Sequence, residues 1–552
     1  MRHLDRRIGA LFAAFLLLFV VAVARAAWVQ GVQGGGLAAD ARSQQTETAT
    51  IPGIRGRILD RRGHELAVSE DAADIVATPY QLGDAGRVAA KLAPALHTSR
   101  GKVLDAIRAG SSGFAYIARQ VSLPTAERIR ELHLRGISTL PSTRRVYPAG
   151  KLASQVIGAV GIDNQGLTGL EAADNSVLAG SNGQREVVLD GLGKELVRHT
   201  IRPATEGQDV RLTIDAGIQA RTEEVLRHVA ATFQPHGATA IAMNPQNGEV
   251  LAMADWPSGD PSHPGSDSAA ELSNMATGFT YEPGSTFKAF TVAGAMMDHK
   301  VTPHTSIGVP PSLQVADRTI TDAEAHGYET LTVAQILAYS SNIGAVEIGM
   351  RDGARRFNHW VREFGFSKAT GIDFPGEERG IVPRPSQYSG STMGNLPMGQ
   401  GLSVTPIQIA TAYSAIANGG IIRRPRLVLR AGDQRVREPR GHRVISAADS
   451  AKLRHMLEGV LAPGGTASEV SVPGYTLAGK TGTAQKVVNG TYSDTQFVAS
   501  FVGFAPARDP KLLVAIVVDQ PTRGSYYGGT VAAPAFGEIA RFALPYLGIP
   551  PT

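Results

Sequence analysis

The stretch YEPGSTFKAFTVAGAMM, residues 281–297, brings a serine, a lysine and an apolar helix together in one short segment. Pro283 and Gly284 are typical of a loop, and the residues from Ser285 onward are apolar on almost every side. This pattern predicts a helix through the middle of a domain, with Ser285 at its N-terminus. Residues three positions apart share a helix face, so the Lys288 ammonium is expected to reach back to the Ser285 hydroxyl. Unpaired N–H groups in the first turn would favour an oxyanion there.

A purely structural interpretation of this pair stays open at this point. The same Ser-x-x-Lys spacing occurs at Ser99 and Lys102. Serine is a common helix N-cap and lysine a common surface residue, so the spacing alone does not identify a catalytic pair.

Composition excludes several classes of function. A chain of 552 residues predicts two or three domains. The net charge of +5 is small for this length, so nucleic acid is not an expected partner. The absence of cysteine excludes disulfides, thiolate metal sites and cysteine nucleophiles. The 14 histidines show no metal-binding spacing, so neither a metal nor another cofactor is expected.

The N-terminus combines basic residues with an apolar run. Three arginines lie within residues 1–7, and residues 8–24 carry no charge. The run is at the short end for a membrane-spanning helix, and the basic cluster predicts that residues 1–7 form a cytoplasmic tail. We predict a single transmembrane anchor over residues 8–28, while a cleavable signal peptide ending at Ala24 or Ala26 stays open. In either case the rest of the chain is expected on the extracytoplasmic side of the cell membrane.

The next predicted parts are a linker and an N-terminal module. Residues 29–50 are rich in Gly, Ala and small polar residues and predict a flexible linker. Residues 51–230 predict a β-rich N-terminal module, with a small helical subdomain over residues 87–108 and 125–134. Further β and turn character is expected at residues 145–148, 169–171 and 187–189. Residues 210–214 predict a strand, and Asp215 the N-cap of a following helix.

The C-terminal module, residues 236–545, is predicted to have strands at both ends. Two apolar segments joined by turn residues form each expected hairpin, and a helix closes the module. Strands at both ends with helices between them indicate one antiparallel sheet and an α+β fold class. The expected strands are 238–243, 250–254, 497–504 and 512–518, and the helix is 532–543.

Two further motifs change the interpretation of Ser285. Ser340-Ser341-Asn342 follows a helical segment, and Lys480-Thr481-Gly482-Thr483 lies on a predicted strand. Neither Ser-x-Asn nor Lys-[Ser/Thr]-Gly recurs in the sequence. The order Ser-x-x-Lys, Ser-x-Asn, Lys-Thr-Gly is that of the penicillin-recognising serine acyltransferases.

The chemistry of acyl transfer needs these residue types. Ser285 is the candidate nucleophile, and Lys288 can act as its base if desolvation and nearby positive charge lower the pKa of its amine. Ser340 is placed to shuttle a proton to the leaving amine, and the Asn342 amide can bind a peptide group. Ser341 has the structural alternative of supporting the turn.

The third motif predicts a substrate-binding strand. Lys480 and the hydroxyls of Thr481 and Thr483 offer a cationic, hydrogen-bonding end for a carboxylate. Gly482 leaves the strand edge bare for an acyl chain to lie along it. The backbone N–H groups of Ser285 and Thr483 would form an oxyanion hole. Thr483 also has a structural alternative, in which it only supports the fold.

The chain resembles the class B penicillin-binding proteins, the membrane-anchored D,D-transpeptidases that cross-link peptidoglycan. The resemblance covers nearly the whole chain after the anchor, and Met275 departs from it because the family often has Arg there. The matching segments include Arg55-Gly56-Arg57-Ile58, Arg145-Val146-Tyr147-Pro148, Gly169-Leu170-Glu171, Leu212-Thr213-Ile214-Asp215, Glu282-Pro283-Gly284-Ser285, Gly399-Gln400-Gly401 and Ala478-Gly479-Lys480-Thr481-Gly482-Thr483.

The resemblance implies that residues 51–230 are a pedestal of the dimerisation type and residues 236–545 a transpeptidase domain, and it also implies a reaction and partners. Ser285 would attack the penultimate D-Ala carbonyl of a peptidoglycan stem peptide, release D-Ala and pass the acyl group to a neighbouring amine, and β-lactams would acylate the same serine. The expected partner is a polytopic glycosyltransferase of the shape, elongation, division and sporulation (SEDS) type, with other cell-wall assembly proteins in the membrane.

Several functional alternatives stay open. The division-specific branch, with a septal role, is favoured over the elongation branch. A serine β-lactamase and a non-catalytic β-lactam sensor or scaffold are the alternatives from other classes.

Overall fold

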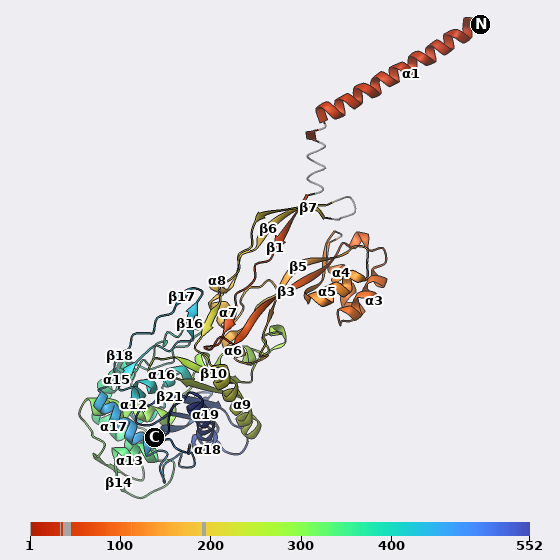
Figure 1. The fold of residues 1–552 in the computed structure, drawn as a ribbon. Helices are drawn as coiled ribbons and strands as arrows, with labels where there is room; N and C mark the ends of the chain where they lie inside the picture. Colours follow the sequence, from red (N-terminus) through yellow and green to blue (C-terminus); the bar gives the residue numbers. More distant parts are fainter. Residues whose placement is uncertain (1, 34, 37–45, 112, 190–194) are drawn as a thin grey trace. The chain divides into compact units, whose positions relative to one another are not determined.

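The computed structural model describes residues 2–33, 35–36, 46–111, 113–189 and 195–552, and its contacts separate into two compact units (Figure 1). The first unit consists of Met1–Ile54, Asp71–Thr143 and Gly180–Glu206. The second consists of Arg55–Glu70, Arg144–Ala179 and Gly207–Thr552.

The N-terminal helix α1, Arg2–Trp28, continues as a π-helical turn over Val29–Gln33. Within the described ranges, one helix is long and apolar enough to cross a membrane, Arg6–Gln33, with a mean hydropathy of 2.5. It is a candidate membrane anchor.

The predicted linker, residues 29–50, lies partly outside the described residues, namely at 34 and 37–45. At its far end, residues 46–50 of the predicted linker belong to strand β1, which begins at Thr46 and pairs with β6. The linker therefore ends earlier than predicted.

The first unit contains the predicted helical subdomain. Helices α3, α4 and α5 pack around apolar residues spaced as the sequence indicated, including Leu92, Val103 and Ile129. Ser99 is the N-cap of α4 and accepts a hydrogen bond from the Lys102 backbone N–H at 3.2 Å, so this second Ser-x-x-Lys is a helix cap. The elements are α3 (Ala85–Ala95), α4 (Arg100–Ala109), α5 (Leu123–Glu131), β4 (Ala115–Ser122), β1 (Thr46–Ile51), β6 (Gly183–Leu189) and β7 (Glu195–Arg202).

A five-stranded antiparallel sheet forms the centre of the second unit. Its order is β10-β9-β21-β20-β19, so strands from both ends of the predicted module lie side by side and β19 is at an edge. This confirms the sequence-based expectation of an α+β fold. The strands are β9 (Gly237–Met243), β10 (Val250–Trp256), β19 (Ala478–Val488), β20 (Thr491–Ala505) and β21 (Leu512–Asp519).

Helices pack against this sheet and against one another. Helices α9 and α19 contact each other and the sheet, while α16 packs against β9, β20 and β21. Asp215 caps α9 as predicted, since its carboxylate accepts from the N–H groups of Gly217 and Ile218. The helices of this unit include α9 (Ala216–Phe233), α12 (Lys288–Met297), α13 (Val333–Tyr339), α14 (Asn342–Asp352), α15 (Ala354–Glu363), α16 (Pro406–Ala417), α17 (Ala447–Glu458), α18 (Gly528–Val531) and α19 (Ala533–Tyr546).

Smaller elements complete the two units. They include β2 (Ile58–Leu59), β3 (Glu65–Ala77), β5 (Ile137–Val146), α6 (Ser154–Ile157), α7 (Gly169–Ala173), α8 (Asn175–Leu178), β8 (Val210–Leu212), α10 (Ala269–Leu272), α11 (Met275–Gly278), β11 (Ser306–Val309), β12 (Leu313–Val315), β13 (Arg318–Ile320), β14 (Glu329–Thr332), β15 (Ile421–Ile422), β16 (Val428–Ala431), β17 (Gln434–Arg435) and β18 (His442–Arg443).

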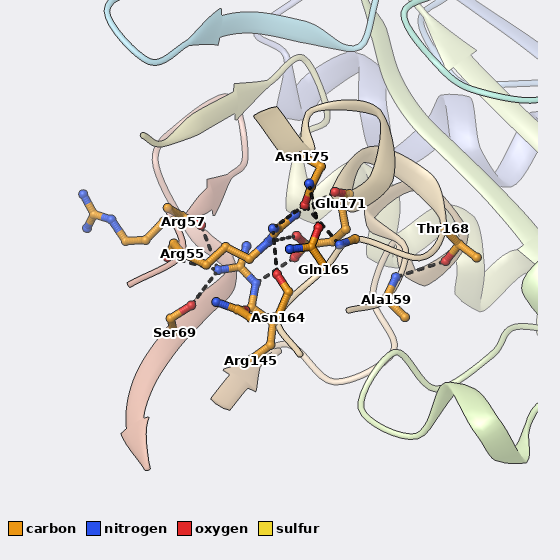
Figure 2. Close-up of polar contacts among 12 residues, drawn as sticks. Arg55, Arg57, Ser69, Arg145, Ala159, Asn164, Gln165, Thr168, Glu171 and Asn175 are labelled. Atoms are coloured by element: carbon orange, nitrogen blue, oxygen red, sulfur yellow. Dashed lines mark hydrogen bonds and ion pairs between the residues drawn. The ribbon is translucent and has the colours of Figure 1, made fainter. Parts of the chain in front are cut away.

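A buried ionic cluster lies in the second unit (Figure 2). The Glu171 carboxylate accepts from Arg55 Nε at 2.5 Å and from Arg145 Nε at 2.7 Å, and the Arg55 and Glu171 side chains are fully buried. Arg55 also donates to Asn175 Oδ1 at 2.7 Å and to the Glu171 backbone oxygen at 2.6 Å. The arginines and the glutamate of three separate sequence motifs therefore hold one another.

This cluster explains one wrong prediction. Residues 169–171 were expected to have β and turn character, but they begin the short helix α7. Arg55 binds both the backbone oxygen and the side chain of Glu171, which fixes the helical turn. Such a contact, between residues 116 positions apart, leaves no trace in the local sequence pattern.

Candidate active site

Ser285 lies in a tight turn between a loop and a buried helix. Gly284–Phe287 form a single 3₁₀ turn, and α12 begins at Lys288, so Ser285 precedes the α-helix by one turn instead of opening it. Gly284 has φ +54°, a conformation that favours glycine. The Tyr413 hydroxyl, on α16, donates a hydrogen bond to the Thr286 backbone oxygen at 2.6 Å and so holds the turn in place.

Aromatic packing fixes the start of α12. Phe287 and Phe290 are buried, and the ring of Phe290 lies 4.9–5.1 Å from those of Phe364, Phe366 and Tyr413. Aromatic pairs at such distances have strong orientational preferences. The turn that carries Ser285 therefore rests on a rigid base.

Lys288 is fully buried and points at the second motif. Its Nζ donates to the Ser340 backbone oxygen at 2.5 Å, to Asn342 Oδ1 at 2.8 Å and to Ser340 Oγ at 3.3 Å. Burial lowers the pKa of Lys288 to about 7, and the charge of Asp322 opposes this shift. A large fraction of this amine is consequently unprotonated near neutral pH.

The second motif joins two helices. Ser340, with φ +62°, ends α13, and Asn342 is the first residue of α14. Ser341 is the N-cap of α14, since its hydroxyl accepts from the Gly344 N–H at 2.9 Å. Ser341 therefore supports the turn, as in its structural alternative, while Ser340 and Asn342 accept hydrogen bonds from Lys288.

The third motif lies on the edge strand β19. Lys480 is fully buried, and its Nζ donates to the Thr481 backbone oxygen at 3.3 Å. Burial, together with the charge of Lys288, lowers the pKa of Lys480 well below its usual value. Thr481 shares a 2.7 Å hydrogen bond with Thr466, and Thr483 Oγ1 accepts from the Gly528 N–H at 3.0 Å.

The edge strand contacts the turn that carries Ser285. A Cβ on Gly482 would lie 2.9 Å from Thr286 Cγ2 and 3.0 Å from the Pro283 oxygen. A Cβ on Gly284 would lie 3.3 Å from the Thr483 oxygen. Only a glycine at position 482 permits this approach, and the structure brings all three predicted motifs into one site.

Sequence reasoning missed Asp322. This residue follows β13, and its carboxylate accepts from the backbone N–H groups of Asn342 and Ile343 and from Ser341 Oγ. No local pattern around Asp322 suggests a functional residue, since its partners lie about twenty positions further along the chain.

Glu282 was quoted in the family motif but given no role. Its carboxylate accepts from the Gly401 N–H at 3.0 Å and from the Tyr492 hydroxyl at 3.3 Å. The guanidinium of Arg318 lies over the Tyr492 ring. These contacts tie the loop before Ser285 to the hairpin that carries β19.

A metal centre finds no support among the described residues. No group of three or more His, Cys, Asp or Glu side chains there is arranged to hold a metal ion.

Comparisons with known proteins show the family to which this chain is similar. The family Penicillin binding protein transpeptidase domain matches residues 238–541, and the Penicillin-binding Protein dimerisation domain matches residues 50–212. Stage V sporulation protein D of Bacillus subtilis is 35% identical over 549 residues, covering 97% of this chain and 85% of that protein. Peptidoglycan D,D-transpeptidase FtsI of Escherichia coli is 31% identical over 552 residues, covering 99% and 92%.

A solved structure is also similar. The crystal structure of penicillin binding protein 3 from Mycobacterium tuberculosis, complexed with aztreonam, matches with a TM-score of 0.71 and 30% identity, covering 91% of this chain and 98% of that one. The chain therefore belongs to the penicillin-binding proteins, in their class B branch, which confirms the resemblance noted from the motifs. It is an enzyme of the D,D-transpeptidase class.

Proposed function

We propose that the chain cross-links peptidoglycan through an acyl-enzyme on Ser285. The observation that carries this proposal is the buried amine of Lys288, which lies between Ser340 and Asn342 and one helical turn from Ser285. An unprotonated amine in this position can take the proton of a serine hydroxyl. The similarity to named peptidoglycan D,D-transpeptidases supports the same chemistry.

The hydrogen bonds of Lys288 suggest how the base works. An ammonium has three N–H donors, and three acceptors surround Nζ. Loss of one proton would release the longest contact, the one to Ser340 Oγ at 3.3 Å. The lone pair would then face the Ser340 hydroxyl, while the two shorter bonds keep the amine in place.

The proposed reaction starts with attack of Ser285 Oγ on the carbonyl carbon of the penultimate D-Ala. The serine proton passes to Lys288 Nζ, and the carbonyl oxygen becomes an oxyanion near the N–H groups of Ser285 and Thr483. Collapse breaks the C–N bond, and the leaving amine of D-Ala takes the proton by way of Ser340. An acceptor amine then attacks the ester, its proton returns to Ser285, and the cross-link is released.

The remaining site residues are proposed to bind the stem peptide. Asn342 would bind a peptide group of the substrate, and Gly482 leaves room for the acyl chain along β19. Lys480, Thr481 and Thr483 would bind the terminal carboxylate. A carboxylate would raise the pKa of the buried Lys480 and so restore its charge when the substrate is present.

We further propose a cellular role. The anchor over residues 8–28 would hold the pedestal, residues 51–230, and the transpeptidase domain, residues 236–545, on the extracytoplasmic side of the membrane. The resemblance to the division-specific branch supports a septal role and a SEDS-type glycosyltransferase as the partner. Depletion of the protein would test this role, since filaments indicate a septal function and rounded cells an elongation function.

Intact-mass spectrometry tests the acyl-enzyme. The full chain in detergent is mixed briefly with benzylpenicillin, and we expect one covalent adduct that is lost in Ser285→Ala. Ser99→Ala is the matched control, because Ser99 has the same Ser-x-x-Lys spacing but caps a helix, and it should keep the adduct. An adduct that persists in Ser285→Ala would refute the proposed nucleophile.

The same experiment separates the alternatives. Loss of the drug without a lasting adduct would indicate a β-lactamase, and an intact drug without adduct would contradict a penicillin-reactive site. A stable adduct with no release of D-Ala from a D-Ala-D-Ala stem peptide would indicate a sensor.

A further inference from the structure

Asp322 lies at the junction between the second motif and the general base. Its Oδ1 accepts from the Asn342 N–H at 2.5 Å and from the Ile343 N–H at 3.0 Å, and its Oδ2 accepts from Ser341 Oγ at 2.7 Å. The two N–H groups are free donors of the first turn of α14, an eleven-residue helix. A carboxylate is favoured there by the helix dipole.

The loop of Asp322 also sets the orientation of the Asn342 side chain. Asn342 Nδ2 donates to the backbone oxygen of Thr321 at 2.9 Å, so Oδ1 is turned toward Lys288 Nζ, 2.8 Å away. A reversed amide would place two donors against each other at Lys288. Backbone and side-chain contacts from residues 321–322 thus fix which end of the amide faces the base.

Charge reaches Lys288 from two elements. The amine of Lys480 on β19 lies near enough for the charge of Lys288 to lower its pKa, and the carboxylate of Asp322 faces Lys288 from the loop after β13. Asp322 is itself faced by His326, whose Nε2 lies 3.2 Å from Oδ2 while its Nδ1 donates to the Gly327 oxygen. The Asp322 side chain is 11% exposed, so water screens its charge weakly.

We propose that Asp322 is a positioning residue for the reaction, which orients the Asn342 amide and sustains the basicity of Lys288. Its negative charge opposes the effect of burial on Lys288. This inference rests on the proposed acyl-enzyme at Ser285. In this proposal the loop after β13, which lies outside the three motifs, sets the pH range in which Lys288 can act as a base.

The test measures the acylation rate of the full chain by a fluorescent penicillin between pH 5 and 9. In Asp322→Asn we expect the half-maximal pH to fall by roughly one unit, the size expected for the loss of one neighbouring charge. We also expect the plateau rate to fall by about tenfold or more, because the amide is less well oriented.

Asp322→Glu separates charge from position. It keeps the carboxylate but displaces it by one methylene, so the half-maximal pH should stay at the wild-type value while the plateau rate falls. Asp373→Asn is the matched control, since Asp373 also accepts from two backbone N–H groups, those of Leu427 and Val428, outside the three motifs. It should change neither quantity.

A merely structural Asp322 would lower the rate in both variants without moving the half-maximal pH of Asp322→Asn, and that result would overturn the proposal. Failure of the wild-type chain to form the adduct would refute the proposed function instead.

In that case a second measurement still tests the effect of Asp322 on Lys288. We would measure the free energy of unfolding as a function of pH for the wild-type chain and for Lys288→Met. The difference between the two reports the titration of Lys288 and needs no acylation. Because the folded pKa of Lys288 is lowered to about 7, the unfolded chain binds more protons above that pH, and relative stability should rise as pH increases. In Asp322→Asn the rise should start roughly one pH unit lower. An unchanged onset would overturn the inference.

Discussion

Replacement of Glu171 by glutamine should destabilise the chain far more than the small change in size suggests. Glu171 is fully buried and is the carboxylate that Arg55 and Arg145 share (Figure 2). Glutamine keeps the shape and one acceptor oxygen, but its amide nitrogen would face an arginine Nε, a donor against a donor. Two guanidinium groups would then be buried without a counter-charge.

The remaining contacts of the arginines set the magnitude. Arg55 keeps the Asn175 oxygen and the Glu171 backbone oxygen, and Arg145 keeps the Gly56 oxygen at 2.8 Å. These neutral acceptors satisfy donors but do not offset charge. Removal of one partner from a buried ion pair costs about 3–5 kcal/mol, and we expect a loss in this range. It is a large part of the roughly 5–15 kcal/mol by which a domain is stable.

Urea unfolding of the full chain in detergent, followed by circular dichroism, measures this loss. The matched control is Glu65→Gln, because Glu65 also pairs with an arginine, Arg57, at 3.3 Å, but its side chain is 46% exposed. Exposed pairs contribute about 0–1 kcal/mol, so the control should unfold almost as the wild type does. Equal losses in the two variants, or a Glu171→Gln loss below about 1 kcal/mol, would refute the reasoning.

Three other measurements follow from the site and the sheet. The acylation rate of Ser285 should rise with pH and reach half its maximum near pH 7, where Lys288 loses its proton, and Lys288→Arg should be inactive at every pH tested. Gly482→Ala should slow acylation at least about tenfold, because the added Cβ would lie 2.4 Å from Ser500 Oγ, 2.9 Å from Thr286 Cγ2 and 3.0 Å from the Pro283 oxygen and would displace the turn that carries Ser285, while Gly113→Ala, with no atom within 4 Å, should not. Burial raises the pKa of Asp255 to about 7, so this group's contribution to stability should fall as pH rises from about 4 to 7, and Asp255→Asn should remove that part of the pH dependence of urea unfolding.

The sequence carried enough information to predict the sheet and the motifs. The hairpins β9–β10 and β20–β21 follow from apolar segments separated by turn residues, and the order of motifs placed Ser285, Lys288 and Lys480 in one site. Local apolar patterning determines such strands because one face or both must be buried. Every residue of β9 and β21 is buried, which suits two central strands of the sheet, and these two strands pair with each other.

What the sequence could not predict depends on contacts between distant segments. Asp322 has a role only because α14 begins beside its loop, and the helical turn at residues 169–171 depends on Arg55. The lowered pKa of Lys288 likewise arises from complete burial, which no motif encodes. Motifs predict which groups react, whereas the fold sets the charge and orientation of these groups.

The two buried lysines connect stability with substrate choice. Lys288 and Lys480 are fully buried and repel each other, and this burial weakens the folded state when both are charged. Asp322 compensates one of them in part. A substrate carboxylate beside Lys480 would raise the pKa of this lysine, so its binding should be accompanied by proton uptake and should be stronger for a peptide with a free C-terminal carboxylate than for one with an amidated end. In the proposed reaction, we therefore expect a preference for a free C-terminus, because a carboxylate would stabilise the charged form of the buried Lys480.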